Sequence, residues 1–182
     1  MRESGILMHI TSLPAPYGIG TMGKDAYAFV DFLVRAGQRY WQILPLTPTG
    51  YGDSPYQSLG ACAGNHYLID LDRLADEGLL KKEEIQNIPW GSNPARVDFG
   101  AMYAHRMNVL RLAFQRFAPD EAYETFVEQN QSWLEDYALF TALKDTLGGK
   151  PWLDWPEALR LRKADALAEK RRELSDEIRL QY

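Results

Sequence analysis

The apolar residues of the first forty-six positions fall into three segments with different periods. Residues 6–10 form a short apolar run that stops at the turn-rich string TSLPAPYGIG, a pattern typical of a buried strand. Residues 23–36 place apolar side chains at helical spacing and are followed by Gly37. Residues 40–46 form a second apolar run that contains a proline and is followed by another. Strand, helix and strand predict a βαβ unit, whose two parallel strands belong to a sheet buried on both faces.

The remainder of the chain has a predominantly helical pattern. Apolar residues recur at helical spacing over residues 100–117, and again from Pro119 to the Gly148-Gly149 pair. An aromatic turn, KPWLDWPEALRLR, then leads into a charged helix over residues 163–182. No strand candidate occurs after about Ile69. The pattern therefore predicts two strands followed by a helical region.

Two parallel strands are not a stable sheet by themselves, because their faces need helices and their edges need further strands or cover. The chain begins an α/β fold, yet its later pattern supplies no more strands and is still helical at Tyr182. We therefore expect this sequence to be the front piece of a longer protein.

Composition narrows the class of protein. The 182 residues include 20 Lys and Arg against 25 Asp and Glu, which gives a formal net charge of −5. With 46% hydrophobic and 12% aromatic residues the chain is globular, which excludes a wholly disordered protein. The acidic balance argues against a nucleic-acid partner. The apolar stretch at residues 5–8 is too short for a signal peptide or a membrane span, so we expect a cytoplasmic protein with no membrane partner.

The residues that most often bind metals or act as nucleophiles are few and scattered. Cys62 is the single cysteine, so it cannot form an intrachain disulfide, and we expect it to be a small buried hydrophobe. His9, His66 and His105 lack the spacing of a helical metal site. We therefore predict no metal site, and no motif assigns a catalytic residue.

Gly18 to Gly23 spell G-x-G-x-x-G between the first strand and the helix. In a dinucleotide-binding fold such glycines hold a pyrophosphate at the helix N-terminus. Two features oppose that interpretation. Residues 11–17 separate the strand from the glycines, and no acidic residue stands where the next strand ends, in QILPLTP. We expect no nucleotide cofactor.

The loop over residues 47–64 contains the string GYGDSPYQS and follows the second strand, on the side where α/β folds bind ligands. Tyr51 and Tyr56 can stack on sugar rings and hydrogen-bond through their hydroxyls. Asp53, Ser54 and Gln57 can bind vicinal hydroxyls. The alternative is that Asp53 and Ser54 only form a turn, with the tyrosines packing against it. The loop alone does not favour either interpretation.

Several sequence segments, taken together, resemble a known family. The segment from HITSLPAPYGIG through AGQRYWQILPL to GYGDSPYQS is similar to the opening of the 4-α-glucanotransferases, the amylomaltases or disproportionating enzymes of glycoside hydrolase family 77. The likeness continues through YLIDLDRL, VDFGAMYAHR, WLEDYALFTALK and GGKPWLDWPEALRLR, in the family's order. Departures are modest: His66 stands where the family usually has proline, and Thr21-Met22 replaces a more common acidic–apolar pair.

The resemblance implies an α/β fold that is the amino-terminal part of a (β/α)8 TIM barrel. Residues 5–10 and 39–46 would be its first two parallel strands, with a mostly helical insertion after the second. Residues 1–64 would then start the barrel and carry the substrate-binding loop. Residues 65–182 would form the helical insertion, and the chain would stop before the rest of the barrel.

The resemblance also implies a reaction, the transfer of an α-1,4-glucan segment between maltooligosaccharides, amylose or starch by retaining double displacement. That chemistry uses two carboxyl groups and requires no cofactor or metal. The family's catalytic carboxylates come from later barrel strands, so no catalytic residue falls within this chain. Tyr56 matches a tyrosine at the donor-sugar site, Asp53 and Ser54 share its motif, and Tyr51 matches a tyrosine of a second glucan-binding groove.

Two functions of different classes remain open. The first is the amino-terminal part of a 4-α-glucanotransferase, inactive when isolated. The second is a non-catalytic glucan-binding module, or half of a split enzyme that pairs with a separate carboxyl-terminal part of the barrel. The helical pattern that still runs uncapped at Tyr182 favours the first, although Tyr182 as a docking aromatic near a helix stop would fit the second.

Overall fold

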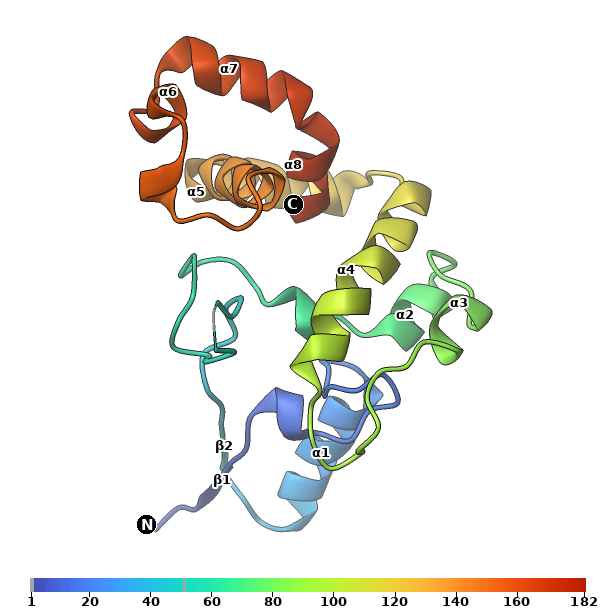
Figure 1. Ribbon diagram of the computed structural model, residues 1–182. Helices are drawn as coiled ribbons and strands as arrows, with labels where there is room; N and C mark the ends of the chain where they lie inside the picture. Colours follow the sequence, from blue (N-terminus) through green and yellow to red (C-terminus); the bar gives the residue numbers. More distant parts are fainter. Residues whose placement is uncertain (1, 51) are drawn as a thin grey trace. The chain divides into compact units, whose positions relative to one another are not determined.

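The computed structural model describes residues 2–50 and 52–182 (Figure 1). The elements in chain order are β1 (Gly5–Leu7), the 3₁₀ turn η1 (Ile10–Ser12), α1 (Lys24–Arg35), β2 (Tyr40–Gln42), the 3₁₀ turn η2 (His66–Leu68), α2 (Leu71–Asp76), α3 (Glu83–Gln86), α4 (Phe99–Arg116), α5 (Glu121–Thr146), the 3₁₀ turn η3 (Trp152–Asp154), α6 (Glu157–Arg160), α7 (Ala164–Glu173) and α8 (Ser175–Gln181). Between residues 70 and 182 the regular elements are all helical, as the sequence pattern predicts.

The predicted βαβ unit is confirmed. Strands β1 and β2 pair in parallel with Ile6 opposite Trp41, and α1 connects them. Met8 and Arg39 extend the pairing with one backbone hydrogen bond each, from Met8 N to Gln42 O and from Arg39 N to Ser4 O. Strand β1 is shorter than its apolar run because the chain turns into η1 at Ile10.

The expectation that this sheet is buried on both faces is wrong for the described chain. Leu7 is 60% exposed and Tyr40 is also 60% exposed. Helix α1 covers part of the sheet, where the Phe29 ring contacts Trp41 at 4.9 Å between centroids, while Ala26 and Leu33 on the same helix are buried. Because the sheet of the described residues has only two strands, both strands are edges, and the side chains away from α1 stay open to solvent.

The contacts of the chain divide it into two compact units, Met1–Phe117 and Ala118–Tyr182. In the first unit Tyr17 and Ile19 of the early loop share a core with residues of η2, α2, α3 and α4. A second cluster lies under α1 and includes Ile10, Leu13 and Leu68. Residues 65–117 therefore pack with the residues around the strands. The boundary after residue 64 that the resemblance implies stays a prediction.

The second unit is a helical cluster around α5. Helix α5 ends where the Gly148-Gly149 pair predicts, because both glycines adopt positive φ and Gly149 N donates to Lys144 O at 2.8 Å. The predicted single helix over residues 163–182 is wrong, since Leu174 departs from helical geometry at φ −105° and ψ 23°. That break lets α8 turn back along α5, where Leu174 and Ile178 are buried (Figure 1).

None of the helices in residues 2–50 and 52–182 combines the length and the apolar character that crossing a bilayer requires. Cys62, expected to be buried, is exposed. It lies on the loop after β2, and loops run over the surface because buried backbone without regular pairing is costly.

Asp70 joins α2 to the loop before α1. Its Oδ1 accepts from Arg73 N at 2.9 Å and caps α2, and its Oδ2 accepts from the Thr21 hydroxyl at 2.5 Å. Asp70→Ala removes both bonds, so we expect the free energy of unfolding at pH 7 to fall by about 1–3 kcal/mol in urea titrations. Asp76→Ala, at the exposed end of the same helix, is the matched control and should leave stability nearly unchanged. Equal effects of the two substitutions would contradict this role of Asp70.

Candidate functional site

The loop after β2 folds back on itself as a compact turn. Thr49 and Ser58 form an antiparallel bridge, and Gly50 N donates to Gln57 O at 2.8 Å. Inside this closure Asp53 N donates to Gly50 O at 3.2 Å, and Gln57 N donates to Ser54 O at 3.1 Å. The backbone bonds therefore bring Asp53, Ser54, Tyr56 and Gln57 into one turn, called the 50–57 turn below. Tyr51, the remaining predicted site residue, lies outside the described residues.

Asp53 is the strained residue of the 50–57 turn. Its φ is +56°, a left-handed conformation that few residues other than glycine adopt. Its carboxylate Oδ1 accepts a hydrogen bond from the hydroxyl of Tyr103, which lies fifty positions later on α4. Burial, followed by this bond and the charge of Asp53, raises the pKa of Tyr103 to about 12. The hydroxyl therefore stays protonated at neutral pH and holds the turn against α4.

The other predicted residues of the turn remain available to a ligand. The Tyr56 side chain is 72% exposed, and Gln57 is exposed beside it. The Ser54 hydroxyl oxygen accepts from Tyr56 N at 3.3 Å, which is the local serine bond of a turn. Ser54 therefore behaves as the turn interpretation expects. The carboxylate of Asp53, in contrast, bonds outside the turn, and the exposed Tyr56 ring does not pack against the turn.

Aromatic and charged side chains of η2 and α4 lie next to Tyr103. The ring of Tyr67 contacts the ring of Tyr103 at 6.1 Å and that of His66 at 4.3 Å. Arg106, one helical turn beyond Tyr103, is fully buried, and its Nη2 donates to Tyr67 O at 3.1 Å and to Ile69 O. Burial lowers the pKa of Arg106 to about 10, against the charge of Asp70, so the guanidinium remains charged at neutral pH.

Sequence reasoning missed Tyr103 and Arg106. Both occur in the string VDFGAMYAHR, three positions apart, which places them on one face of a helix. Met102 and Val109 on that helix are fully buried, so an arginine within the same apolar pattern is a detectable signal. The pairing of Tyr103 with Asp53 had no such signal.

The glycine string Gly18 to Gly23 has a structural explanation. Gly23 caps the N-terminus of α1, and a Cβ there would lie 1.7 Å from the Asp70 Oδ2. A carboxylate therefore already packs against the position where a dinucleotide fold would hold a pyrophosphate, and two anions would repel there. Across residues 2–50 and 52–182, no group of three or more His, Cys, Asp or Glu side chains is arranged to hold a metal ion.

Comparison with known proteins gives consistent matches along the chain. A family model described as 4-alpha-glucanotransferase matches residues 8–182. A 4-alpha-glucanotransferase of Streptococcus pneumoniae serotype 4 is 49% identical over 181 residues, covering 97% of this chain and 36% of the relative. That of Thermus thermophilus is 50% identical over 183 residues, with the same two coverages of 97% and 36%. The chain thus spans little more than a third of the length of these relatives.

Solved structures agree with the sequence matches. An amylomaltase of Streptococcus agalactiae in complex with acarbose superposes with a TM-score of 0.93 at 46% identity, covering 100% of this chain and 37% of that one. An amylomaltase of Corynebacterium glutamicum superposes with a TM-score of 0.66 at 20% identity, covering 98% of this chain and 26% of that one, which supports the fold alone.

Tyr103→Phe tests whether α4 holds the 50–57 turn. Loss of the hydroxyl leaves the left-handed Asp53 without its long-range bond, so amide hydrogen exchange at Gly50 and Gln57 should accelerate by about fivefold, equivalent to about 1 kcal/mol. Tyr27→Phe is the matched control, since Tyr27 is 67% exposed on α1. Unchanged exchange in the Tyr103 variant would show that the turn closes without it.

His66 makes stability depend on pH. Burial, and to a lesser degree the charge of Arg106, lowers the pKa of His66 from 6.5 to about 4. Between these values the unfolded chain takes up a proton that the folded chain does not, so the free energy of unfolding should fall as pH drops from 6.5 toward 4. Urea titrations across this window should give a shallower pH dependence for His66→Gln than for the unmodified chain. The same slope in both proteins would contradict the assignment.

Proposed function

The chain belongs to the 4-alpha-glucanotransferase family, and from that membership we propose that it forms the amino-terminal part of an enzyme that transfers α-1,4-glucan segments. Its substrates would be maltooligosaccharides, amylose or starch. Two findings carry the proposal. The family model matches residues 8–182, and two relatives named 4-alpha-glucanotransferase are 49% and 50% identical to this chain.

In this proposal β1 and β2 are the first two parallel strands of a (β/α)8 barrel. Residues 1–64 begin the barrel, and residues 65–182 form a mostly helical insertion after the second strand. The superposition on an amylomaltase at a TM-score of 0.93 supports this arrangement. The exposed faces of β1 and β2 are consistent with it, because further barrel strands and helices would cover them.

The 50–57 turn would bind the donor glucan. Tyr56 offers an exposed ring for stacking on a pyranose, and Ser54 and Gln57 offer hydrogen-bonding groups within the same turn. Asp53 holds the turn through Tyr103. Tyr51, which the resemblance assigns to a second glucan-binding groove, would bind glucan there rather than at the donor site. The similar amylomaltase of Streptococcus agalactiae was solved in complex with acarbose, which supports glucan binding in this fold.

The chemistry would come from carboxyl groups elsewhere in the complete protein. Retaining transfer needs a carboxylate that attacks the anomeric carbon, and a second carboxyl group that protonates the leaving oxygen and then deprotonates the acceptor 4-hydroxyl. Three aspartates of the first unit are engaged otherwise: Asp53 with Tyr103, Asp70 with Thr21, and Asp72 with the Tyr17 hydroxyl at 2.6 Å. Their bonds hold the fold, which supports a binding role for this part.

The proposal is tested with maltotriose. The 182-residue chain alone should release no glucose. A chimera in which this chain replaces the matching segment of the Thermus thermophilus relative should convert maltotriose to glucose and longer maltooligosaccharides. In the chimera Tyr56→Ala should lower kcat/KM by the equivalent of about 1–3 kcal/mol, because stacking and a hydrogen bond are lost.

Tyr27→Ala, at an exposed position of α1, is the control and should leave transfer unchanged in the chimera. Glucose release by the isolated chain, in proportion to its concentration, would contradict the assignment of the chemistry to other segments. A folded chimera that binds maltotriose without transferring it would favour the glucan-binding module instead.

A further inference from the structure

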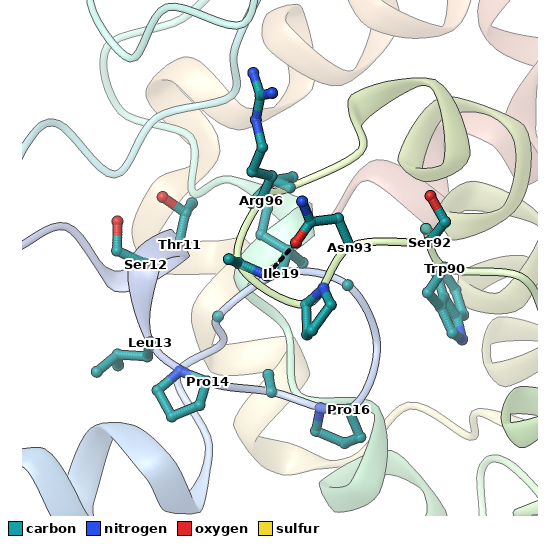
Figure 2. Close-up of a pocket in the computed structure, with 17 residues that line it drawn as sticks. Thr11, Ser12, Leu13, Pro14, Pro16, Ile19, Trp90, Ser92, Asn93 and Arg96 are labelled. Carbon is teal, nitrogen blue, oxygen red and sulfur yellow. Dashed lines mark hydrogen bonds between the residues drawn. The ribbon is translucent and has the colours of Figure 1, made fainter.

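We propose that a crevice between residues 11–20 and residues 90–97 binds a glucose unit of an α-glucan, as a site separate from the 50–57 turn. The crevice has a volume of about 580 Å³, within the range of about 300–1,000 Å³ that small-molecule sites occupy. Figure 2 shows Thr11 and Ser12 on one side of it, with Asn93 and Ser92 on the other. The four described residues of the predicted site, Asp53, Ser54, Tyr56 and Gln57, do not line it. The choice of glucan as ligand rests on the proposed function.

The walls of the crevice are held by the core. Gly20 N donates to Thr11 O at 3.1 Å, which closes the first wall into a loop. The two walls meet at Gly18, which has φ +77° and where a Cβ would lie 2.3 Å from Trp90 O. Trp90 is buried and its Nε1 donates to Ile85 O at 2.9 Å. The site is therefore preformed, which lowers the entropy cost of binding.

The polar groups of the walls are free to face a ligand. Within the described part of the chain, the hydroxyls of Thr11, Ser12 and Ser92 and the guanidinium of Arg96 make no hydrogen bond. Asn93 Oδ1 accepts from Ala95 N at 2.9 Å, so its amide NH₂ remains available as a donor. The residues that line the crevice thus include three with hydroxyls, one with an amide and one cation.

This set of groups fits a neutral sugar best. Serine and threonine hydroxyls both donate and accept, as sugar hydroxyls do. Pro14, Pro16 and Pro94 add apolar ring surface for the C–H face of a pyranose. No acidic residue is among those that line the crevice in the described structure, which disfavours a cation as ligand. A phosphate site usually has several backbone N–H groups or bidentate arginines, whereas this crevice has the single exposed Arg96.

The test is an NMR titration of the 182-residue chain with maltose, followed through its backbone amide signals. We expect saturable shifts of the signals from residues 11–20 and 90–97, and we expect them to persist in Tyr56→Ala. A variant carrying Thr11→Val, Ser12→Ala and Ser92→Ala removes the three hydroxyls with little change of shape. It should weaken binding at this crevice by about tenfold or more.

The matched control carries Ser4→Ala, Thr125→Val and Ser132→Ala at exposed positions away from the crevice, and should bind as the unmodified chain does. Shifts that do not saturate, or equal binding by both triple variants, would overturn the proposal. So would stronger shifts of the same signals with inorganic phosphate, which would assign the crevice to anions.

Failure here is distinguishable from failure of the proposed function. Transfer by the chimera with no maltose shifts at the crevice would overturn the crevice alone. Saturable crevice shifts together with a folded, inactive chimera would support the crevice and contradict the transferase.

Discussion

The Arg106 guanidinium is a positive charge with no exposed surface, and backbone carbonyls rather than a carboxylate receive it. Its Nη2 donates to Tyr67 O and Ile69 O, and its carbon Cζ lies 5.9 Å from the centre of the Trp90 ring. A buried charge is tolerated only where the surrounding groups stabilise it. These two bonds join helix α4 to residues 67–69, whereas Nε and Nη1 of the same guanidinium are buried without a hydrogen-bond partner in the described structure.

Both proposed binding places depend on this arrangement. Tyr103 is one turn before Arg106 on α4, so the position of its hydroxyl, and with it the left-handed Asp53, follows from where α4 lies. Trp90, whose ring lies beneath the guanidinium, is among the residues that line the crevice. A single helix thus carries Tyr103, which holds the surface turn, and Arg106, which lies over the Trp90 ring.

The local hydrophobic pattern of the sequence predicted the helices and strands well, but it predicted less well which residues pack against each of them. Helix α1, the end of α5 at Gly148-Gly149 and the parallel strand pair follow from short-range rules of period and capping. The exposure of Leu7 and the break at Leu174 do not, because they depend on what packs against each element. The same division applies to the site. The 50–57 turn groups residues that are adjacent in sequence, whereas its contact with Tyr103 joins positions fifty residues apart, for which a single sequence carries no signal.

The two proposed sites differ in how they are held, and that difference bears on what each can do. The 50–57 turn is exposed, strained at Asp53 and tied by one long-range side-chain bond, so it belongs to the segments that open at low free-energy cost. The crevice walls join the core at Gly18 and Trp90, so opening them requires disrupting packed residues. A turn that adjusts suits a donor site that must admit and release successive glucan segments. A rigid crevice suits holding one sugar unit while the rest of the glucan attached to that unit moves.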